Sequence, residues 1–209
     1  MFKKSLALAA AAAVGALSVA ALHAQGTPTL PGVHDRARVT AGTYTADPNH
    51  TQILYTYGHL GFTNNMGLLS GAKGTLVLDP ANPNGAKLSI DVPVSTIHTS
   101  IAALDAELVG PMFFDAAKFP NAHFESTSVS ANGDNATING NLTIKGVTKP
   151  ATIRATFESA GANPMSKRQT ISFKGTTTIN RADFGLGNAV PMVAAQVDIT
   201  ITTAFEKQA

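Results

Sequence analysis

The chain has 209 residues, including 15 Lys and Arg, 13 Asp and Glu, and no cysteine. Without cysteine it can form no disulfide, thiolate metal site or cysteine nucleophile, and it cannot carry a lipid anchor on an N-terminal cysteine. Two of the basic residues, Lys3 and Lys4, lie in the first 24 residues, so the rest of the chain has as many basic as acidic residues. No basic cluster remains that would bind a phosphate backbone, which excludes nucleic acid as an expected partner.

Residues 1–24 have the pattern of a secretory signal peptide. A pair of lysines precedes a small and apolar run from Ser5 to Leu22, and Ala24 is a small residue at the expected cleavage point. The run is rich in alanine and contains Gly15, so it is a weak candidate for a permanent membrane span. We therefore expect export to the periplasm without a stable membrane anchor, with an uncleaved N-terminal anchor as the alternative.

The rest of the chain divides into a short linker and one domain. Residues 25–42 contain Pro28 and Pro31 and show no hydrophobic periodicity, which is typical of a flexible linker. Residues 43–207 alternate between apolar and polar positions, which predicts antiparallel strands around one core. The positions on the apolar faces are Ile53, Tyr55, Tyr57, His59; Gly74, Leu76, Leu78; Leu88, Ile90, Val92, Val94; Ile138, Gly140, Leu142, Ile144; Ile171, Phe173, Gly175, Thr177, Ile179; and Val197, Ile199, Ile201, Thr203, Phe205.

Turn residues and one helical segment complete the predicted fold. Asn84-Gly85 and Asn132-Gly133 lie between strands, where residues that tolerate a left-handed backbone close hairpins. Residues 100–117 have apolar residues at helical spacing, which predicts one or two short helices across one end of the sheet. The prediction is an all-β fold, an eight-stranded antiparallel barrel with a short helical segment between strands. A two-sheet sandwich is the alternative.

Five motifs follow one another in order along the predicted domain. They are Tyr44-x-x-Asp47-x-x-His50-Thr51 with Tyr55-x-Tyr57-x-His59-Leu60-Gly61; Gly67, Gly74 and Asp79; Phe113-Phe114-Asp115 with Phe119-Pro120 and Phe124-Glu125-Ser126; Gly140-Asn141-Leu142-Thr143-Ile144-Lys145-Gly146; and Asn180-Arg181-x-Asp183-Phe184-Gly185. Together, from about Thr43 to Glu206, they resemble the YceI family of exported, lipocalin-like proteins.

The resemblance implies an eight-stranded barrel that encloses a long apolar molecule, such as a polyisoprenoid, a quinone-like tail or a fatty-acid-like tail, without catalysis. Two departures concern the head group of such a ligand. The helical segment of the family usually carries an Arg-Asp pair and a His, where this chain has Leu104, Asp105 and Glu107. Met112 stands where an acidic residue is common. The resemblance therefore supports the barrel more strongly than the identity of the ligand.

The main hypothesis for function is an exported protein that sequesters or carries a long-chain isoprenoid or another amphiphile inside the barrel. Inward glycines, namely Gly74, Gly140 and Gly175, leave volume free, and aromatic residues gather around the helical segment, where a mouth would lie. The expected ligand-binding residues are Ile53, Tyr55, Tyr57, His59, Leu76, Leu78, Phe113, Phe114, Phe119, Phe124, Ile138, Leu142, Phe173, Arg181 and Phe184. A barrel filled by its own side chains, acting as an interaction module, is the alternative. A homodimer is left open.

No catalytic residue, metal site or cofactor is expected. The histidines lack the spacing that places metal ligands on one helix face, and no nucleophile elbow, HExxH or phosphate-binding loop is present. His59 is interpreted first as a hydrogen-bonded wall residue and second as a contact for the polar end of a ligand. A less favoured hypothesis is an enzyme that acts on an apolar substrate, with His59 and a nearby tyrosine as acid and base.

Overall fold

The structure is a computed structural model that describes residues 29–209. The predicted signal peptide, residues 1–24, and the start of the predicted linker lie outside the described residues. The elements, in chain order, are η1 (Arg36–Arg38), β1 (Gly42–Ala46), β2 (Gln52–His59), β3 (Thr63–Ser70), β4 (Lys73–Leu78), η2 (Pro83–Gly85), β5 (Lys87–Pro93), η3 (Val94–Thr96), α2 (Ala102–Val109), β6 (Asn121–Asn132), β7 (Asn135–Ile144), β8 (Val147–Ala162), β9 (Gln169–Asn180), η4 (Arg181–Phe184) and β10 (Gln196–Lys207).

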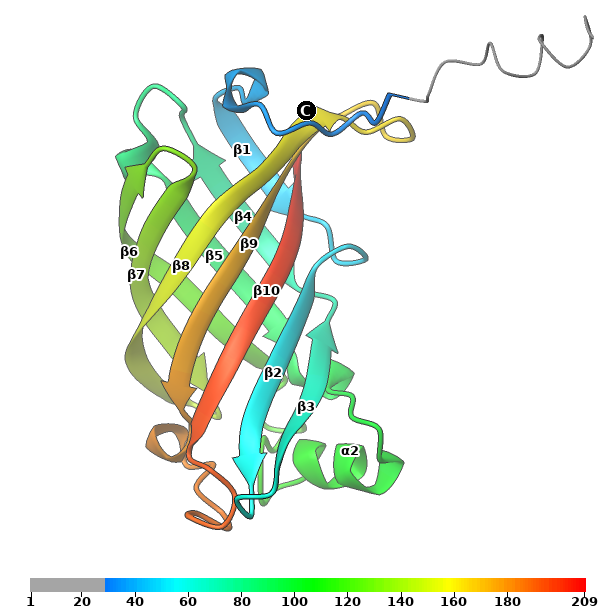
Figure 1. The fold of residues 1–209 in the computed structure, drawn as a ribbon, viewed down its shortest axis with the longest axis vertical. Helices are drawn as coiled ribbons and strands as arrows, with labels where there is room; N and C mark the ends of the chain where they lie inside the picture. Colours follow the sequence, from blue (N-terminus) through cyan, green and yellow to red (C-terminus); the bar gives the residue numbers. More distant parts are fainter. Residues whose placement is uncertain (1–28) are drawn as a thin grey trace, which may run out of the picture. The chain divides into compact units, whose positions relative to one another are not determined.

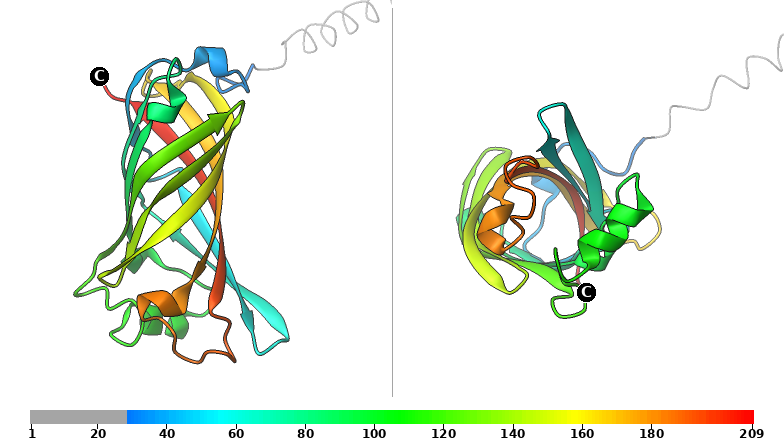
Figure 2. Two further views of the ribbon diagram at one scale, coloured as in Figure 1. Left: turned by 90° about the vertical axis from the view of Figure 1, so that its left-hand side faces the viewer. Right: turned by 90° about the horizontal axis from the view of Figure 1, so that it is seen from below.

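The strands form one antiparallel sheet that closes on itself. The order is β1-β4-β5-β6-β7-β8-β9-β10, and β1 pairs with β10 as well as with β4. Figure 1 shows the strands inclined along the barrel, and Figure 2 shows the ring from one end. Because β1 joins both neighbours, the eight strands form a closed ring without a free edge, whereas a sandwich keeps two separate sheets. The predicted eight-stranded barrel is confirmed, and the sandwich alternative is wrong.

A hairpin of β2 and β3 extends the wall at one end. The C-terminal end of β10 pairs with β1, and Asp198–Thr202 of β10 pair with β2. β1 and β2 are therefore two segments of one barrel strand. The break between them is a turn in which the Asp47 carboxylate accepts from the backbone N–H of Asn49 at 2.9 Å. Beyond β2, the outer edge of β3 meets the chain before α2, where the backbones of Leu68 and His98 exchange two hydrogen bonds. This contact places α2 at the β2–β3 end of the barrel (Figure 1).

The turns follow the backbone requirements of tight hairpins, with one exception. Gly133, between β6 and β7, has φ +61°, as the prediction at Asn132-Gly133 requires. Lys145 and Gly146, between β7 and β8, both have positive φ, which is the backbone of a type I′ turn. The predicted hairpin connection at Asn84-Gly85 is confirmed, because β4 and β5 pair on either side of it, but the left-handed backbone predicted there is wrong. These residues belong to η2, because Pro83 occupies its first position and the Gly85 N–H bonds back to the Asn82 carbonyl.

Part of the segment predicted as a linker contacts the barrel. Val33 and Ala160 exchange two backbone hydrogen bonds, and the Tyr44 hydroxyl donates to the Thr40 carbonyl at 2.6 Å. The contacts of the domain therefore include residues that precede the first strand at Gly42.

The buried side chains gather toward the two ends of the barrel. One cluster, near η1, contains Tyr44, Ala46, Leu76, Phe157, Ala160, Ile171 and Phe205. Two further clusters pack around α2 and η4, the first built on Tyr55, Ile97 and Val197 and the second on Ile144, Phe184 and Leu186. Among residues 29–209, no helix has the length and apolar character needed to cross a membrane.

Candidate binding site inside the barrel

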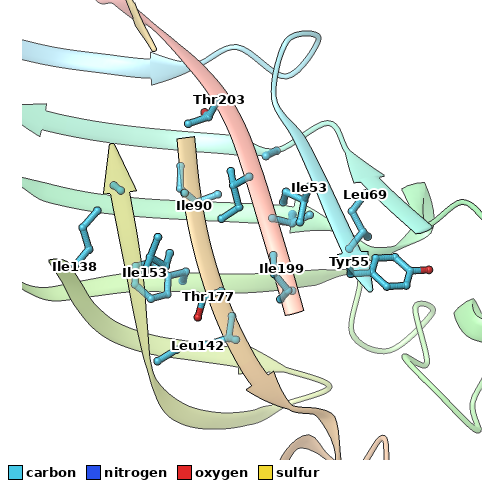
Figure 3. A pocket seen from close by; sticks show the side chains of 18 of the residues that line it. Ile53, Tyr55, Leu69, Ile90, Ile138, Leu142, Ile153, Thr177, Ile199 and Thr203 are labelled. Atoms are coloured by element: carbon cyan, nitrogen blue, oxygen red, sulfur yellow. The ribbon is translucent and has the colours of Figure 1, made fainter. Parts of the chain in front are cut away.

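A cavity of about 930 Å³ occupies the interior of the barrel. Its wall is built mostly from aliphatic and aromatic side chains of β2 and of β4 to β10, and Figure 3 shows several of them pointing inward. A volume of this size lies near the upper end of the range for small-molecule sites. The alternative of a barrel filled by its own side chains is therefore wrong for this structure.

The structure brings thirteen of the fifteen predicted ligand-binding residues to this cavity. They are Ile53, Tyr55, Tyr57, His59, Leu76, Leu78, Phe113, Phe114, Phe124, Ile138, Leu142, Phe173 and Arg181. The period-2 pattern placed most of them correctly, because alternate residues of a barrel strand face the interior.

Phe119 and Phe184 do not line the cavity. Phe184 is buried in the cluster with Ile144 and Leu186, behind the wall at the η4 end. Phe119 covers the β7–β8 turn, where a Cβ on Gly146 would lie 2.7 Å from its ring. Both rings support the wall instead of facing a ligand, because each packs beside a turn outside the inward rows of the strands.

Several lining residues were not among the predicted site residues. Ile153, Ala155 and Phe157 of β8 face the cavity in strict alternation, so their pattern was available in the sequence. Leu104 and Leu108 reach the cavity from α2. No strand pattern could have placed these two, because their position depends on how α2 docks at the end of the barrel.

The inward glycines have two different roles. Gly175 lines the cavity, as predicted. Gly74 and Gly140 do not, so the prediction that they leave cavity volume free is wrong. At Gly140 a Cβ would lie 2.5 Å from the Phe124 ring, and at Gly74 it would overlap the neighbouring strand. These two glycines allow close packing of the wall.

Tyr55 lies at the margin of the cavity beneath α2. It faces Gly67 across the β2–β3 ladder, and a Cβ on Gly67 would overlap the Tyr55 hydroxyl, so only glycine leaves room for the ring. The ring stacks on Tyr57 with 6.2 Å between centroids, and in Figure 3 it extends away from the aliphatic side chains. Burial raises the pKa of the Tyr55 hydroxyl, which has no hydrogen-bond partner among residues 29–209.

Replacing Tyr55 with phenylalanine is expected to change the free energy of unfolding by less than about 0.5 kcal/mol, because it removes a buried hydroxyl that has no partner. Tyr44→Phe is the matched comparison, since the Tyr44 hydroxyl bonds to the Thr40 carbonyl and to Gln169. It should cost about 0.5–1.5 kcal/mol, because it removes the hydroxyl that makes these hydrogen bonds. Urea unfolding of both variants measures the difference, and equal losses would contradict the assignment of an unpaired Tyr55 hydroxyl.

Arg181 enters the cavity at the end formed by η4 and the β2–β3 hairpin. Its side chain is buried and donates four hydrogen bonds, all to backbone carbonyls: Nε to Ala194 at 2.8 Å, Nη1 to Leu186, and Nη2 to Asn188 at 3.0 Å and Val193 at 2.8 Å. Burial lowers the pKa of Arg181, but an arginine remains charged at neutral pH. The guanidinium therefore holds the loop before β10 through hydrogen bonds and places a positive charge beside the cavity.

The opposite end of the cavity carries charges that are paired. Arg36 of η1 lies 2.8 Å from the Asp134 carboxylate, which also accepts from His34 at 2.9 Å. A hydrogen bond to the Glu158 carbonyl, followed by the bond to Asp134, raises the pKa of His34. The charged side chains at the η1 end therefore form salt bridges on the surface, where such pairs contribute little to the free energy of unfolding.

Asp105 of α2 anchors the helix beside the mouth. Its carboxylate accepts from the Thr99 hydroxyl at 2.6 Å, the Thr99 N–H at 2.7 Å and the His98 ring at 2.9 Å. The Thr99 hydroxyl bond is the main cause that lowers the pKa of Asp105 below its usual value. This residue stands at the aspartate position of the family pattern, holds the helix in place and does not face the cavity.

The stability that Asp105 contributes is expected to depend on pH. Because its pKa is lowered in the folded state, its contribution is complete above its unfolded-state pKa, near 4, and disappears as pH falls through the folded value. Asp105→Asn should therefore lower the melting temperature at pH 7, and the difference from the parent should shrink as the pH is lowered below about 4. A difference between variant and parent that stays constant over this range would contradict the assignment.

The five histidines among residues 29–209 make separate contacts. His34, His50, His98 and His123 each pair with an aspartate, whereas His59 lines the cavity and pairs through its backbone with Val193. Within the described part of the chain, no three His, Asp or Glu side chains are grouped to hold a metal ion.

Comparisons with known proteins agree with this architecture. The YceI-like domain family matches residues 44–205. A UPF0312 protein of Pseudomonas fluorescens is 34% identical over 173 residues, which cover 79% of this chain and 87% of the relative. A UPF0312 protein of Pseudomonas syringae pv. tomato is 34% identical over 188 residues, covering 88% and 94%.

Two solved structures share the fold. BcnA of Burkholderia cenocepacia superposes with a TM-score of 0.68 at 22% identity, over 76% of this chain and 98% of that protein. A polyisoprenoid-binding domain from Saccharophagus degradans superposes with a TM-score of 0.58 at 11% identity, over 79% and 98%. The match over nearly all of the barrel, together with relatives at 34% identity, shows that this chain belongs to the YceI family.

Proposed function

We propose that this chain is an exported binding protein, without catalytic activity, that sequesters or carries a long apolar ligand inside its barrel. The observation that carries the proposal is the cavity of about 930 Å³ with an almost entirely apolar wall. Each CH₂ group that such a wall removes from water contributes about 0.8 kcal/mol. A long chain can therefore bind tightly without a specific polar contact.

The chemical class of the ligand follows from the shape and composition of the wall. An isoprenoid, quinone-like or fatty-acyl tail fits a site of aliphatic and aromatic side chains between β2 and β10, with few polar groups along its length. The solved domain described as polyisoprenoid-binding has the same fold, which supports this class. Selectivity along the tail is expected to be loose, with length and head group deciding between ligands.

Export is supported by the signal-peptide pattern of residues 1–24. An exported carrier of this kind would act in the periplasm, where a poorly soluble amphiphile needs a protein to cross water. Fractionation of cells that produce the full chain tests this part of the proposal. We expect the shortened chain in the periplasmic fraction, and full-length chain in the cytoplasm would contradict it.

A series of saturated fatty acids tests the proposed ligand class. Two additional CH₂ groups should tighten binding by about 1.6 kcal/mol, or more than tenfold, until the tail fills the cavity. Isothermal titration with acids of 10, 12, 14 and 16 carbons measures this slope, with each acid kept below its micelle concentration. Affinity that is independent of length, or absent at every length and also for geranylgeraniol, would overturn the proposal.

A further inference from the structure

The charge on Arg181 is not compensated by any acidic side chain in contact with it. Within residues 29–209, no carboxylate lies within 4.0 Å of the guanidinium, and the sequence has no acidic residue before Asp35. Four N–H groups bond to backbone carbonyls, and a guanidinium has five, so one hydrogen on Nη1 has no acceptor among the described residues. Buried charges in proteins are normally paired.

Polar side chains line the cavity at the same end as this charge. Tyr57, His59, Asn65 and Asn188 all line it. Asn65 faces Tyr57 across the β2–β3 ladder, and the backbone of His59 pairs with Val193, whose carbonyl accepts from Arg181. These elements therefore bring a buried cation and several hydrogen-bonding groups to one end of a mostly apolar cavity.

The other charged side chains near the cavity do not balance the positive charge of Arg181. At the η1 end, Arg36 is paired with Asp134. Lys174 of β9 also lines the cavity, but it is exposed and lies 3.6 Å from the Glu158 carboxylate. At the α2 end, Glu107 lines the cavity and Asp183 lies on η4, but both are exposed, where water and salt screen them. The electrostatic potential inside the cavity is therefore expected to be most positive beside Arg181.

We propose that the Arg181 end of the cavity is the head-group site and that it takes an anionic head, a carboxylate or a phosphate, with the tail extending toward η1. The inference rests on the proposed function and specifies the polarity and orientation of the ligand. A carboxylate or phosphate oxygen would accept the free Nη1 hydrogen and supply the counter-charge, and such charge-assisted bonds are the strong ones. It also explains how a chain with Leu104 in α2, where the family usually has a polar residue, can still select a head group.

Matched ligands of 16 carbons test the charge preference in the unmodified chain. Isothermal titration compares hexadecanoate and hexadecyl phosphate with hexadecanol and hexadecylamine, all at pH 7.5 and below their micelle concentrations. We expect both anions to bind about 10- to 100-fold more tightly than the alcohol, and the amine to bind most weakly. Equal affinities for all four would overturn the head-group site and leave the proposed function intact, whereas binding of none would overturn the proposed function itself.

Nitroxide-labelled octadecanoates test the orientation. A label at carbon 16 should broaden the amide resonances of Ala37 and Ala131 at the η1 end, and a label at carbon 5 should broaden those of Leu186 and Asn188. The reverse pattern would overturn the orientation. Replacement of Arg181 is a weaker test, because the same side chain holds four carbonyls of the loop and its loss is expected to unfold that region.

Discussion

Thr177→Trp is expected to weaken the binding of a 16-carbon ligand by about 200-fold and to leave the barrel folded. Thr177 lies on the inner face of β9, where Figure 3 shows it among the aliphatic side chains of the cavity. An indole at this position would occupy the space of about four CH₂ groups of the tail, which corresponds to about 3 kcal/mol. Because the indole enters empty volume, the free energy of unfolding should change by less than about 1 kcal/mol.

Thr176→Trp is the matched control for this variant. Thr176 is the preceding residue of the same strand and is exposed on the outer face, so its replacement should leave the affinity within about twofold. Titration with hexadecanoate and a thermal unfolding curve for each variant separate loss of binding from loss of fold. Unchanged affinity in a folded Thr177→Trp variant would mean that ligands do not bind inside the barrel.

Gly74→Ala is expected to destabilise the fold by about 3–5 kcal/mol. Gly74 has φ +145°, and a Cβ there would overlap the Ser89 carbonyl oxygen and lie 2.9 Å from the Cα of Ile90. The positive φ costs an alanine about 1–3 kcal/mol of backbone strain. Moving β4 and β5 apart to make room for the Cβ costs about the same again. Thermal unfolding should show a fall in melting temperature of about 10 °C, since 1 kcal/mol corresponds to about 2–4 °C in a domain of this size.

Gly133→Ala controls for the effect of a left-handed glycine alone. Gly133 also has positive φ, +61°, but a Cβ at this position would have no atom within 4 Å. Its replacement should therefore cost only about 1–2 kcal/mol. Similar losses for the two variants would show that the close approach of β4 and β5 does not determine the effect at Gly74.

The strands and the barrel could be predicted from the sequence because each inward row keeps period 2. The row from Val197 to Phe205 faces the interior as its alternation required. The alternation did not show that one barrel strand is divided into β1 and β2 at Asp47. The division depends on the turn at Asp47 and on the pairing of β1 and β2 with different parts of β10. The resemblance to a known family supplied what periodicity could not, namely the choice of a barrel over a sandwich.

The cavity wall could be predicted better than its ends. Strand residues such as Leu142 and Phe173 face the cavity because of their register alone. Phe119 and Phe184 were misplaced because neither lies on a strand, so alternation does not determine the direction of its side chain. The same limit applied to Gly74, whose missing side chain allows a strand to approach and does not enlarge the cavity. That no carboxylate of residues 29–209 lies within 4.0 Å of the Arg181 guanidinium is a property of the folded chain that the residues next to Arg181 in the sequence do not reveal.

The central claim is that the barrel holds a chain-like amphiphile, and native mass spectrometry of the purified full chain, with organic extraction of the same sample, tests it most directly. The account predicts folded protein that carries an added mass, which denaturation releases as a long-chain compound. A mass equal to that of the protein alone, unchanged after incubation with hexadecanoate and geranylgeraniol, would contradict it.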